Sequence, residues 1–588
     1  IRSKPDSKPD LYSGRGDVAG SVDTPRDVRG FAVKFYTEEG NFDLVGNNLP
    51  VFAIQDAIKF PDFIHAVKME PDRGFPQAAS AHDTFWDFVS LSPETLHMVF
   101  WAMSDRGIPR SLRMMEGFGI HSFRLINAKG NSTFVKFHWR PKLGLQSTLW
   151  DEAVKLQSAD NDFHRRDLYE AISKGDLPEW EFGVQLFTEK EAEKFPFDHL
   201  DPTKLIPEEL VPLQIVGRMV LDRWPDNFFA ETEQVAFCPA NLVPGIDFSN
   251  DPLLQGRLFS YLDTQLSRLG GPNFTNIPIN APKCPFANHQ RDGHMQTLTP
   301  RGRVAYEPNS LDAGSVPTGR ESISGFATFK APTIEGGTLR LRPNLFADHY
   351  TQPRMFFRSQ SELEQAHIAS AFVFELSKVE TAAIRERAIS HLRIVDDELA
   401  RRVASGLGLK KLPPIAKAAL PPVDMAPSAA LGLIGKMLKT LQGRCIGILV
   451  SNGTNLASIS RLKKAAEKAG AQVKLVAPTL TITLSDGSDL DVDGQLAGTP
   501  SVLFDAVASV LTLEEAKKLS SDAAAVDWFR DAFGHLKAIA ACKGTREILA
   551  AGGIEPDDGV VFPEDVAKFI KLAEGRRWSR EPTLRTLA

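Results

Sequence analysis

The stretch FAVKFYTEEGNFDLVGNNLPVFAIQD, residues 31–56, carries a clear strand pattern. Apolar and polar residues alternate on both sides of EEGN, and glycine beside asparagine favours a tight turn. The stretch therefore predicts a hairpin followed by a third strand. A second hairpin, SFRLINAKGNSTFVKFHW, is predicted at residues 122–139, with its turn near Gly130.

The pattern changes along the chain in a way that predicts several units. Residues 81–117 have helical spacing, and Ser92 in SPETL supplies a helix cap and an acidic first turn. Residues 251–269 predict one clear helix within a stretch that is rich in proline, glycine and asparagine. The predicted units are an α+β core at 1–240, a wrapping arm at 241–355, a helical section at 356–409, a Pro/Ala-rich linker at 410–440 and a C-terminal domain at 441–588.

The C-terminal domain has its own pattern. RCIGILVSNG predicts a buried strand, LASISRLKKAAEKAG an amphipathic helix that ends on Gly470, and AQVKLVAP a second strand, with a later strand in HLKAIAACKG. Short alternation of strand and helix predicts a parallel, doubly wound α/β sheet.

The totals exclude several classes of function. The chain has 588 residues, too many for one core, and its 43% hydrophobic and 24% charged residues are ordinary for a globular protein. A net charge of −6 favours neither nucleic acid nor an anionic membrane as a partner. Apolar runs are too short for a bilayer span, no signal peptide is visible, and four scattered cysteines predict neither a disulfide framework nor a zinc site.

The predicted helix GRLFSYLDTQLSR, residues 256–268, holds a candidate functional pair. Arg257 and Tyr261 are four residues apart, so their side chains share a helix face. A guanidinium favours the phenolate form of tyrosine, and phenolate is a hard anionic ligand suited to ferric iron. The alternative is an ordinary Arg/Tyr pair on a surface helix, and the spacing alone does not decide between them.

Five motifs in order resemble those of haem catalases: DLVGNN, FWDFVSLSPETLH, SDRGIP, EQVAFCPANLVPGIDFS and QGRLFSYLDTQ. The resemblance runs almost continuously from about Ser21 to Pro308, and the trailing parallel domain is typical of the large-subunit branch. It implies an antiparallel β-barrel core with a wrapping arm, and a C-terminal domain resembling flavodoxin and class I amidotransferases. It also implies a homotetramer with interlocked arms.

The resemblance further implies disproportionation of hydrogen peroxide to water and dioxygen at a haem, through a ferryl porphyrin-radical intermediate. Tyr261 would be the proximal iron ligand, the ligation known for catalases, and Arg257 would hold it as tyrosinate. Asn47 would orient peroxide on the distal side, and Asp27 would lie in the main access channel. The other implied haem contacts are Gly30, Val45, Phe52, Phe60, Ile120, His121, Phe237, Leu253, Thr264, Gln265 and Arg268. Of these, Arg268 lies two turns beyond Tyr261 and is expected to reach a haem propionate.

The sequence departs from the catalase pattern on the distal side. Catalases carry a distal histidine, a general acid/base, a few dozen residues before a supporting serine that Ser13 matches. The first histidine here is His65, and Leu11 replaces the arginine usual before that serine. The simplest interpretation is that the N-terminal arm is missing from this chain. The alternatives are a catalase-fold haem protein with peroxidase or hydroperoxide-rearranging chemistry, and a haem-binding or assembly protein without rapid catalysis.

Two cysteines suggest further hypotheses. Cys238 lies where some large-subunit catalases join a residue to the Cβ of the proximal tyrosine, so a thioether to Tyr261 is predicted, with a buried free thiol as the alternative. The haem is expected to be b or an oxidised d-type product. Cys542 lies near the nucleophile position of the amidotransferase group, but SNGTNLAS lacks the acidic partner, so a structural role is favoured.

The sequence also suggests where the protein acts. Glycosylation triplets at Asn131, Asn273 and Asn452, with the fungal character of the residue at Cys238, favour a secreted or extracellular protein, with a cytoplasmic one as the alternative. The end RTLA lacks the peroxisomal SKL signal.

Overall fold

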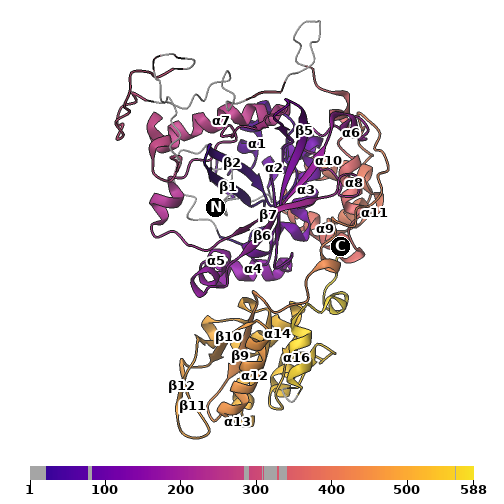
Figure 1. Ribbon diagram of the computed structural model, residues 1–588. Helices are drawn as coiled ribbons and strands as arrows, with labels where there is room; N and C mark the ends of the chain where they lie inside the picture. Colours follow the sequence, from indigo (N-terminus) through magenta and orange to yellow (C-terminus); the bar gives the residue numbers. More distant parts are fainter. Residues whose placement is uncertain are drawn as a thin grey trace.

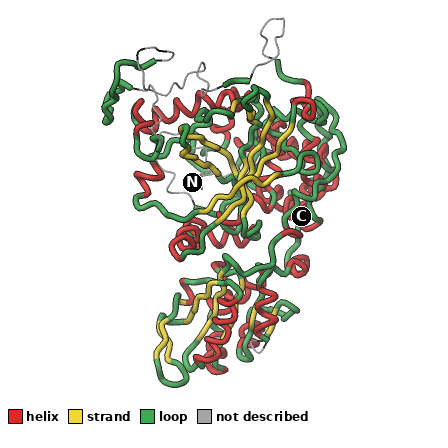
Figure 2. Tube along the Cα trace, in the orientation of Figure 1, coloured by secondary structure: helices red, strands yellow, loops and turns green. Residues whose placement is uncertain are grey.

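The structure is a computed structural model that describes residues 22–76, 82–283, 291–306, 309, 311, 327–329, 341–562 and 565–588. Two groups of strands are separated along its length (Figure 1, Figure 2). The larger group belongs to the core, and the smaller one to the C-terminal domain, drawn in orange and yellow in Figure 1. The last residues of the chain return from this domain to the core, where the C-terminus lies near α9, Glu362–Ser377 (Figure 1).

The core contains one antiparallel sheet of eight strands, ordered β1-β2-β3-β5-β4-β8, with β6 and β7 continuing from the other edge of β5. The predicted first hairpin is confirmed, because β1 and β2 pair in register from Gly30 opposite Asn47 to Thr37 opposite Gly40. The second is confirmed as β4 and β5, with Gly130 in the left-handed region at φ 76°. The strands are β1 Gly30–Thr37, β2 Gly40–Asn47, β3 Gly117–Phe118, β4 Phe123–Ile126, β5 Ser132–Pro141, β6 Glu179–Phe187, β7 Gln214–Val220 and β8 Ile246–Asp247.

The barrel that the resemblance implies is not found as a closed structure. Among the described strands, β1 pairs only with β2 and β7 only with β6, so the sheet stays open at both of these edges. One face is filled by alternating residues of β1, β2 and β5, including Phe31, Leu44 and Trp139. The alternation that predicted strands therefore also builds the core.

Two local predictions in this region are wrong. Residues 50–56 form no strand: the Phe52 N–H donates to the Pro202 carbonyl (2.9 Å), and the Gln55 side chain donates to Asp201 (2.6 Å). The hydrogen-bonding groups of this buried segment are therefore paired with loops and not with a neighbouring strand. Ser92 stands between α2 and the short turn Pro93–Thr95, with Glu94 in the first turn as predicted, but its side chain makes no capping bond. The Thr95 hydroxyl donates to the Ser92 carbonyl instead (2.8 Å).

Helices pack on the core sheet and on each other. Residues 362–406 form the three helices α9 to α11, which share one large apolar cluster with α2, α3 and α8. The helices of the core are α1 Phe60–Ala66, α2 Asp83–Leu91, α3 Leu96–Met103, α4 Trp150–Ala159, α5 Phe163–Lys174, α6 Glu189–Ala192, α7 Pro252–Leu269, α8 Thr351–Arg358, α9 Glu362–Ser377, α10 Ala382–Val395 and α11 Asp397–Gly406. Its short helical turns are η3 Ala57–Lys59, η4 Pro93–Thr95, η5 Asp105–Gly107, η6 Leu112–Met114, the π-helical η7 Phe229–Glu233, η8 Pro272–Asn276, η9 Asn344–Ala347 and η10 Ile434–Lys436.

The C-terminal domain is a doubly wound α/β unit, as the sequence predicts. Six of its strands form one sheet in the order β13-β10-β9-β14-β15-β16, and every pair within this sheet is parallel. Successive strand residues face opposite sides: Ile448 packs with α12 and α16, whereas Leu449 packs with α13, α14 and α15. Both faces are thus covered by helices, which explains the continuous apolar strands.

The elements of this domain are β9 Cys445–Val450, α12 Leu456–Lys468, β10 Gln472–Ala477, β11 Thr481–Thr483, β12 Asp489–Asp491, β13 Gly494–Gln495, η11 Leu496–Gly498, η12 Ser501–Leu503, β14 Ala506–Val510, α13 Leu513–Leu519, α14 Ala523–Gly534, β15 Ile539–Ala540, α15 Thr545–Ala551, β16 Val560–Val561, α16 Val566–Ala573, η13 Trp578–Arg580 and α17 Glu581–Leu584. Within the described parts of both domains, no helix combines the length and the apolar character that crossing a membrane requires.

Candidate active site

Helix α7 positions the predicted ligand. Asp251 caps its N-terminus, accepting from the N–H groups of Leu253 (2.9 Å) and Leu254 (3.1 Å), and Pro252 opens its first turn. Gly256 allows close packing on η3, because a Cβ there would lie 2.1 Å from the Cβ of Ala57. The helix is therefore fixed both at its start and one residue before Arg257.

A chain of four side chains leads to Tyr261. The Arg257 guanidinium donates to the Tyr261 hydroxyl oxygen (2.9 Å) and contacts Nε2 of His121 (2.9 Å). His121 Nδ1 lies 2.5 Å from a carboxylate oxygen of Asp251. The guanidinium also donates to the Val45 carbonyl (3.1 Å), which ties α7 to β2.

The protonation states of these hydrogen-bonded side chains follow from which groups can donate and which can accept. Burial lowers the pKa of His121 below its usual value, although the Asp251 carboxylate opposes this shift. A neutral His121 that donates Nδ1–H to Asp251 leaves Nε2 as an acceptor for Arg257. Arginine can only donate, so the Tyr261 oxygen must accept, which is the arrangement that suits an anionic phenolate.

A strained backbone conformation at Ile120 places the His121 side chain between Asp251 and Arg257. Ile120 has φ 64°, a left-handed conformation that is rare for a β-branched residue. The buried Lys136 ammonium donates to the Ile120 carbonyl (2.9 Å) and holds that conformation. Strain of this kind persists where the surroundings over-determine it, and it is concentrated at functional sites.

The predicted distal residues lie at the paired ends of β1 and β2. Gly30 is opposite Asn47, two residues along β2 from Val45. The two asparagines of VGNN differ: Asn48 is buried and accepts from the Arg29 N–H (2.7 Å) while donating to the Arg106 carbonyl (3.3 Å). In the described chain the Asn47 side chain makes no hydrogen bond, so its amide remains available to a ligand.

Predicted aromatic and apolar contacts gather in two clusters. The rings of Phe52 and Phe60 are stacked, with centroids 6.0 Å apart, and both pack with the buried Leu253 of α7. Phe237 packs with Val45 in a second small cluster. The side chain of Gln265 donates to the Phe237 carbonyl (3.1 Å), so α7 also fixes the segment that carries Phe237.

Three other predicted residues have defined surroundings. Arg268 lies on the Tyr261 face, and its guanidinium donates to Gln265 (3.1 Å) and to the Val235 carbonyl (2.6 Å). Its contact with a propionate remains a prediction. Thr264 is buried on the same helix. Asp27 is half-buried, and a carboxylate oxygen accepts from the Val28 N–H (2.7 Å).

Cys238 is a buried free thiol next to Phe237. Burial raises the pKa of this thiol above its usual value. Its N–H donates to the Asp43 carboxylate (2.9 Å), which is also paired with the ammonium of Lys34 (2.7 Å). The thioether to Tyr261 stays a prediction, and Ser13 lies outside the described residues.

Sequence reasoning missed Asp251 and gave His121 only a haem contact. Asp followed by Pro is a helix-start signal, so the cap could have been predicted. Its second partner could not, because His121 is 130 residues away in sequence. Asp43 was missed for the same reason, since its partners are distant except for Lys34 on the neighbouring strand.

Comparison with known proteins gives the same assignment. Residues 12–313 match the family described as Catalase, residues 343–407 the one described as Catalase-related immune-responsive, and residues 442–580 the C-terminal domain found in long catalases. Catalase C of Rhizobium meliloti is 55% identical over 575 residues, 96% of this chain and 81% of the relative. Catalase HPII of Pseudomonas aeruginosa is 51% identical, over 97% and 81%, and Catalase-B of Dictyostelium discoideum 49%, over 98% and 85%. The chain therefore belongs to the catalase family, in its large-subunit branch with the additional C-terminal domain.

Proposed function

We propose that this chain is a haem catalase that converts hydrogen peroxide to water and dioxygen, with Tyr261 as the protein ligand of the iron. The hydrogen-bonded chain from Asp251 through His121 and Arg257 to Tyr261 carries the proposal. Among the described residues, the partner of the phenol oxygen is a donor, Arg257, and such an oxygen fits ferric haem as a ligand.

When bound, the haem supplies the iron that exchanges electrons with peroxide. The protein residues supply the surroundings. Arg257 keeps the phenol oxygen an acceptor, and neutral His121 keeps Arg257 in place. Asp251 fixes the tautomer of His121 by accepting its Nδ1–H.

On the distal side, we propose that the free amide of Asn47 donates to a peroxide oxygen. The stacked Phe52 and Phe60 keep the approach apolar and narrow, which favours a small substrate. Asp27 would orient peroxide on its way in. The Asn48 amide cannot replace Asn47, because both of its polar atoms are already bonded to the protein.

We further propose that the distal histidine lies in a segment that precedes Ile1. The first histidine here is His65, on α1, well after the position at which catalases carry it. Peptide mapping of the purified natural protein tests this directly. If no such histidine exists, the second candidate is a haem protein with slow peroxidase chemistry, since general acid/base catalysis contributes about 10²–10⁴-fold.

The deciding experiment is a haem spectrum and an oxygen-electrode assay on the purified protein. High-spin ferric haem and rapid oxygen evolution from hydrogen peroxide are expected. Haem binding with oxidation of phenolic donors but without oxygen evolution would favour the peroxidase alternative. Extraction of the haem and its absorption spectrum would decide between the b and d types.

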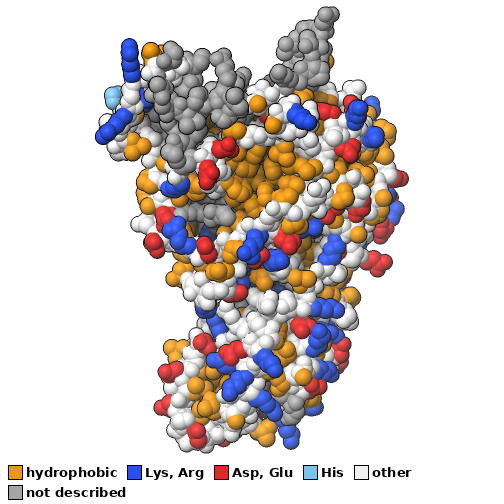
Figure 3. Space-filling model, viewed as in Figure 1, with side chains coloured by type: hydrophobic (Ala, Val, Ile, Leu, Met, Phe, Trp, Pro, Cys, Tyr) orange, Lys and Arg blue, Asp and Glu red, His pale blue; other side chains and the backbone are white. Residues whose placement is uncertain are grey.

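We also propose a homotetramer. Apolar side chains gather on the face of the core shown in Figure 3, whereas the C-terminal domain carries mixed charges. Exposed apolar residues of the core include Ile215 and Val216 on β7 and Phe259 on α7, which is 74% exposed. Contiguous apolar surface is typical of an interface. Light scattering should give four times the monomer mass, and a monomer would contradict the proposal.

The location outside the cell remains our proposal as well. Asn131 is exposed beside the turn of the β4–β5 hairpin, an accessible position for a glycan. Detection of glycosylated Asn131 in protein from the culture medium would support it, and an unmodified protein confined to the cytoplasm would contradict it.

A further inference from the structure

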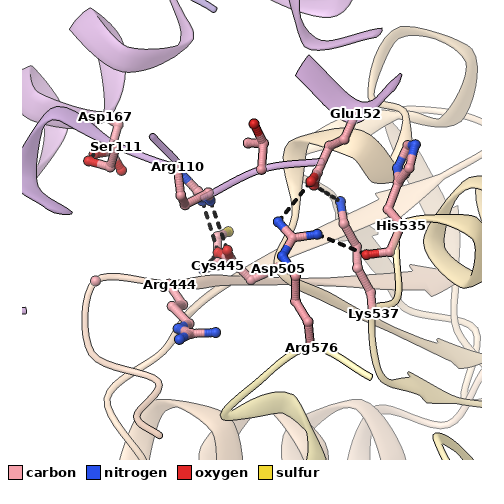
Figure 4. Close-up of polar contacts among 12 residues, drawn as sticks. Arg110, Ser111, Glu152, Asp167, Arg444, Cys445, Asp505, His535, Lys537 and Arg576 are labelled. Carbon is pink, nitrogen blue, oxygen red and sulfur yellow. Dashed lines mark hydrogen bonds and ion pairs between the residues drawn. The ribbon is translucent and has the colours of Figure 1, made fainter. Parts of the chain in front are cut away.

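Two contacts from the C-terminal half of the chain end on one short segment of the core, Asp105–Arg110. The first is a bidentate ion pair in which the Arg110 guanidinium donates to both oxygens of Asp505 (2.8 and 2.9 Å; Figure 4). Both side chains are almost fully buried. Although burial raises it, Arg110 brings the pKa of Asp505 well below its ordinary value, so the pair is charged.

The second contact passes through a buried histidine. His367 on α9 lies between two carboxylates, with Nδ1 2.8 Å from Asp105 and Nε2 2.9 Å from Glu581. Glu581 begins α17, which follows the parallel sheet and lies against the core. The histidine therefore joins the end of the C-terminal domain to the first residue of the same segment.

The backbone of this segment holds the distal ends of β1 and β2. The Arg106 carbonyl accepts from the Asn48 side chain (3.3 Å). The Gly107 carbonyl accepts from the Asp27 N–H (3.3 Å) and from the Arg29 guanidinium. The segment has little room to move, because a Cβ on Gly107 would lie 2.2 Å from the Ala102 carbonyl oxygen.

The residues whose side chains donate to these two carbonyls are direct neighbours, in sequence, of residues of the proposed distal site. Asn48 follows Asn47, and Arg29 precedes Gly30. Asn48 also bonds the Arg29 N–H, so the two strand ends form one unit anchored on residues 106 and 107. A shift of the segment would therefore move the Asn47 amide.

We propose that the C-terminal domain positions the distal half of the site by clamping Asp105–Arg110 from two sides, with Arg110 and His367 as positioning residues. This inference rests on the proposed function for the role of Asn47. The route is continuous: Asp505 and Glu581 hold the segment, the segment holds Asn48 and Arg29, and these hold the strand ends.

The interface offers a matched control. Glu152 on α4 is buried and paired with Lys537 (2.9 Å) and Arg576 (2.7 Å) of the C-terminal domain (Figure 4). Like Asp505→Asn, the change Arg576→Gln removes one charge of the C-terminal domain from a buried pair with the core. Its partner Glu152 lies on α4, outside the clamped segment. Removing one partner of a buried pair is costly in both cases, so both variants should be less stable.

The experiment compares Asp505→Asn, Glu581→Gln and Arg576→Gln in the full-length protein. The readouts are hydrogen exchange of the Arg29 and Asn48 amides and the affinity of the ferric haem for cyanide, a distal ligand. We expect Asp505→Asn and Glu581→Gln to speed this exchange and to change the cyanide dissociation constant about 2- to 30-fold. Arg576→Gln should lower the melting temperature without changing either readout.

Two results would overturn the inference: equal distal changes in all three variants, which would mean general undocking, or no distal change in the first two. A double variant of Asp505 and Glu581 should also deviate from the product of the single effects, since both act on one segment. If the wild type evolves no oxygen, the proposed function fails while the exchange comparison still decides the clamp.

Discussion

The two halves of the site are built differently. The hydrogen-bonded side chains of the proximal half depend mainly on one helix: Asp251, Arg257 and Tyr261 all belong to α7 or its cap, whereas His121 comes from a distant segment. The distal half depends on strand ends that are anchored on Asp105–Arg110, which itself contacts the C-terminal domain. The comparison teaches that a site can combine a part specified locally with a part specified by contacts across the fold.

The largest expected effect breaks the proximal half. Tyr261→Phe removes the phenol oxygen, which is also one of the acceptors of the Arg257 guanidinium, so haem retention and oxygen evolution should fall to background. The haem absorption spectrum and an oxygen electrode measure this. The control is Tyr306→Phe, an exposed tyrosine in the described part of the chain. A normal spectrum and normal turnover in Tyr261→Phe would refute the ligand assignment.

A smaller effect is expected at the far end of this hydrogen-bonded series, at Asp251→Asn. Asparagine caps helices about as well as aspartate, so this change removes mainly the charge opposite His121. Support of a metal ligand by outer partners is worth about 10–100-fold in affinity or activity. We expect kcat to fall within that range. Asp251→Ala should in addition lose about 1 kcal/mol of stability through the missing cap, measured by denaturant unfolding.

In the distal half, we expect Asn47 to affect activity and its neighbour Asn48 to affect stability. Asn47→Ala removes an unbonded amide and should slow the peroxide reaction about 2- to 10-fold, the value of one hydrogen bond, without a change in unfolding free energy. Asn48→Ala leaves buried partners unsatisfied and should cost about 1–3 kcal/mol. Equal stability loss in both variants would contradict the assignment of their roles.

The smallest expected effect is the change in stability per pH unit that His367 causes. Burial lowers the pKa of His367, but Asp105 and Glu581 outweigh it and raise the pKa to about 10 from 6.5. A raised histidine pKa contributes stability fully below pH 6.5 and loses it as pH rises towards 10. The decline is at most about 1.4 kcal/mol per pH unit.

The other groups near His367 set the background of this measurement. They are Arg585, whose Nε lies 3.7 Å from Glu581, the Trp578 ring, and Arg26, which interacts with Asp105. Melting curves from pH 6 to pH 10 should show a steeper loss in the wild type than in His367→Gln. Parallel slopes in the two proteins would show that His367 does not carry the dependence.

The sequence predicts best what is local. Helix α7 is predictable because its cap, its apolar spacing and Gly270 at its end all lie within twenty residues or so of one another. The hairpins follow from alternation around glycine turns. The Phe52 segment was predicted wrongly because its apolar run resembles a strand, whereas its backbone N–H at Phe52 donates to Pro202 in a loop.

What the sequence could not predict is the set of distant partners. Nothing near Asp251 points to His121, and nothing near Arg110 points to Asp505, 395 residues later. The open edges of the core sheet also depend on which strands pair, and alternation alone does not determine pairing. Tertiary contacts of this kind include the bond between Asp251 and His121 on the proximal side. They also include all the contacts that anchor the distal strand ends.

The return of the chain to the core has a consequence for unfolding. The C-terminal domain is preceded by residues 410–440, in which Val423 donates to Thr351, and followed by α17, in which Glu581 binds His367. A domain on a single tether can detach and reorient, but one fixed at entry and exit can leave only when both attachments break. The antiparallel core and the parallel C-terminal domain should therefore unfold together, in a single calorimetric transition.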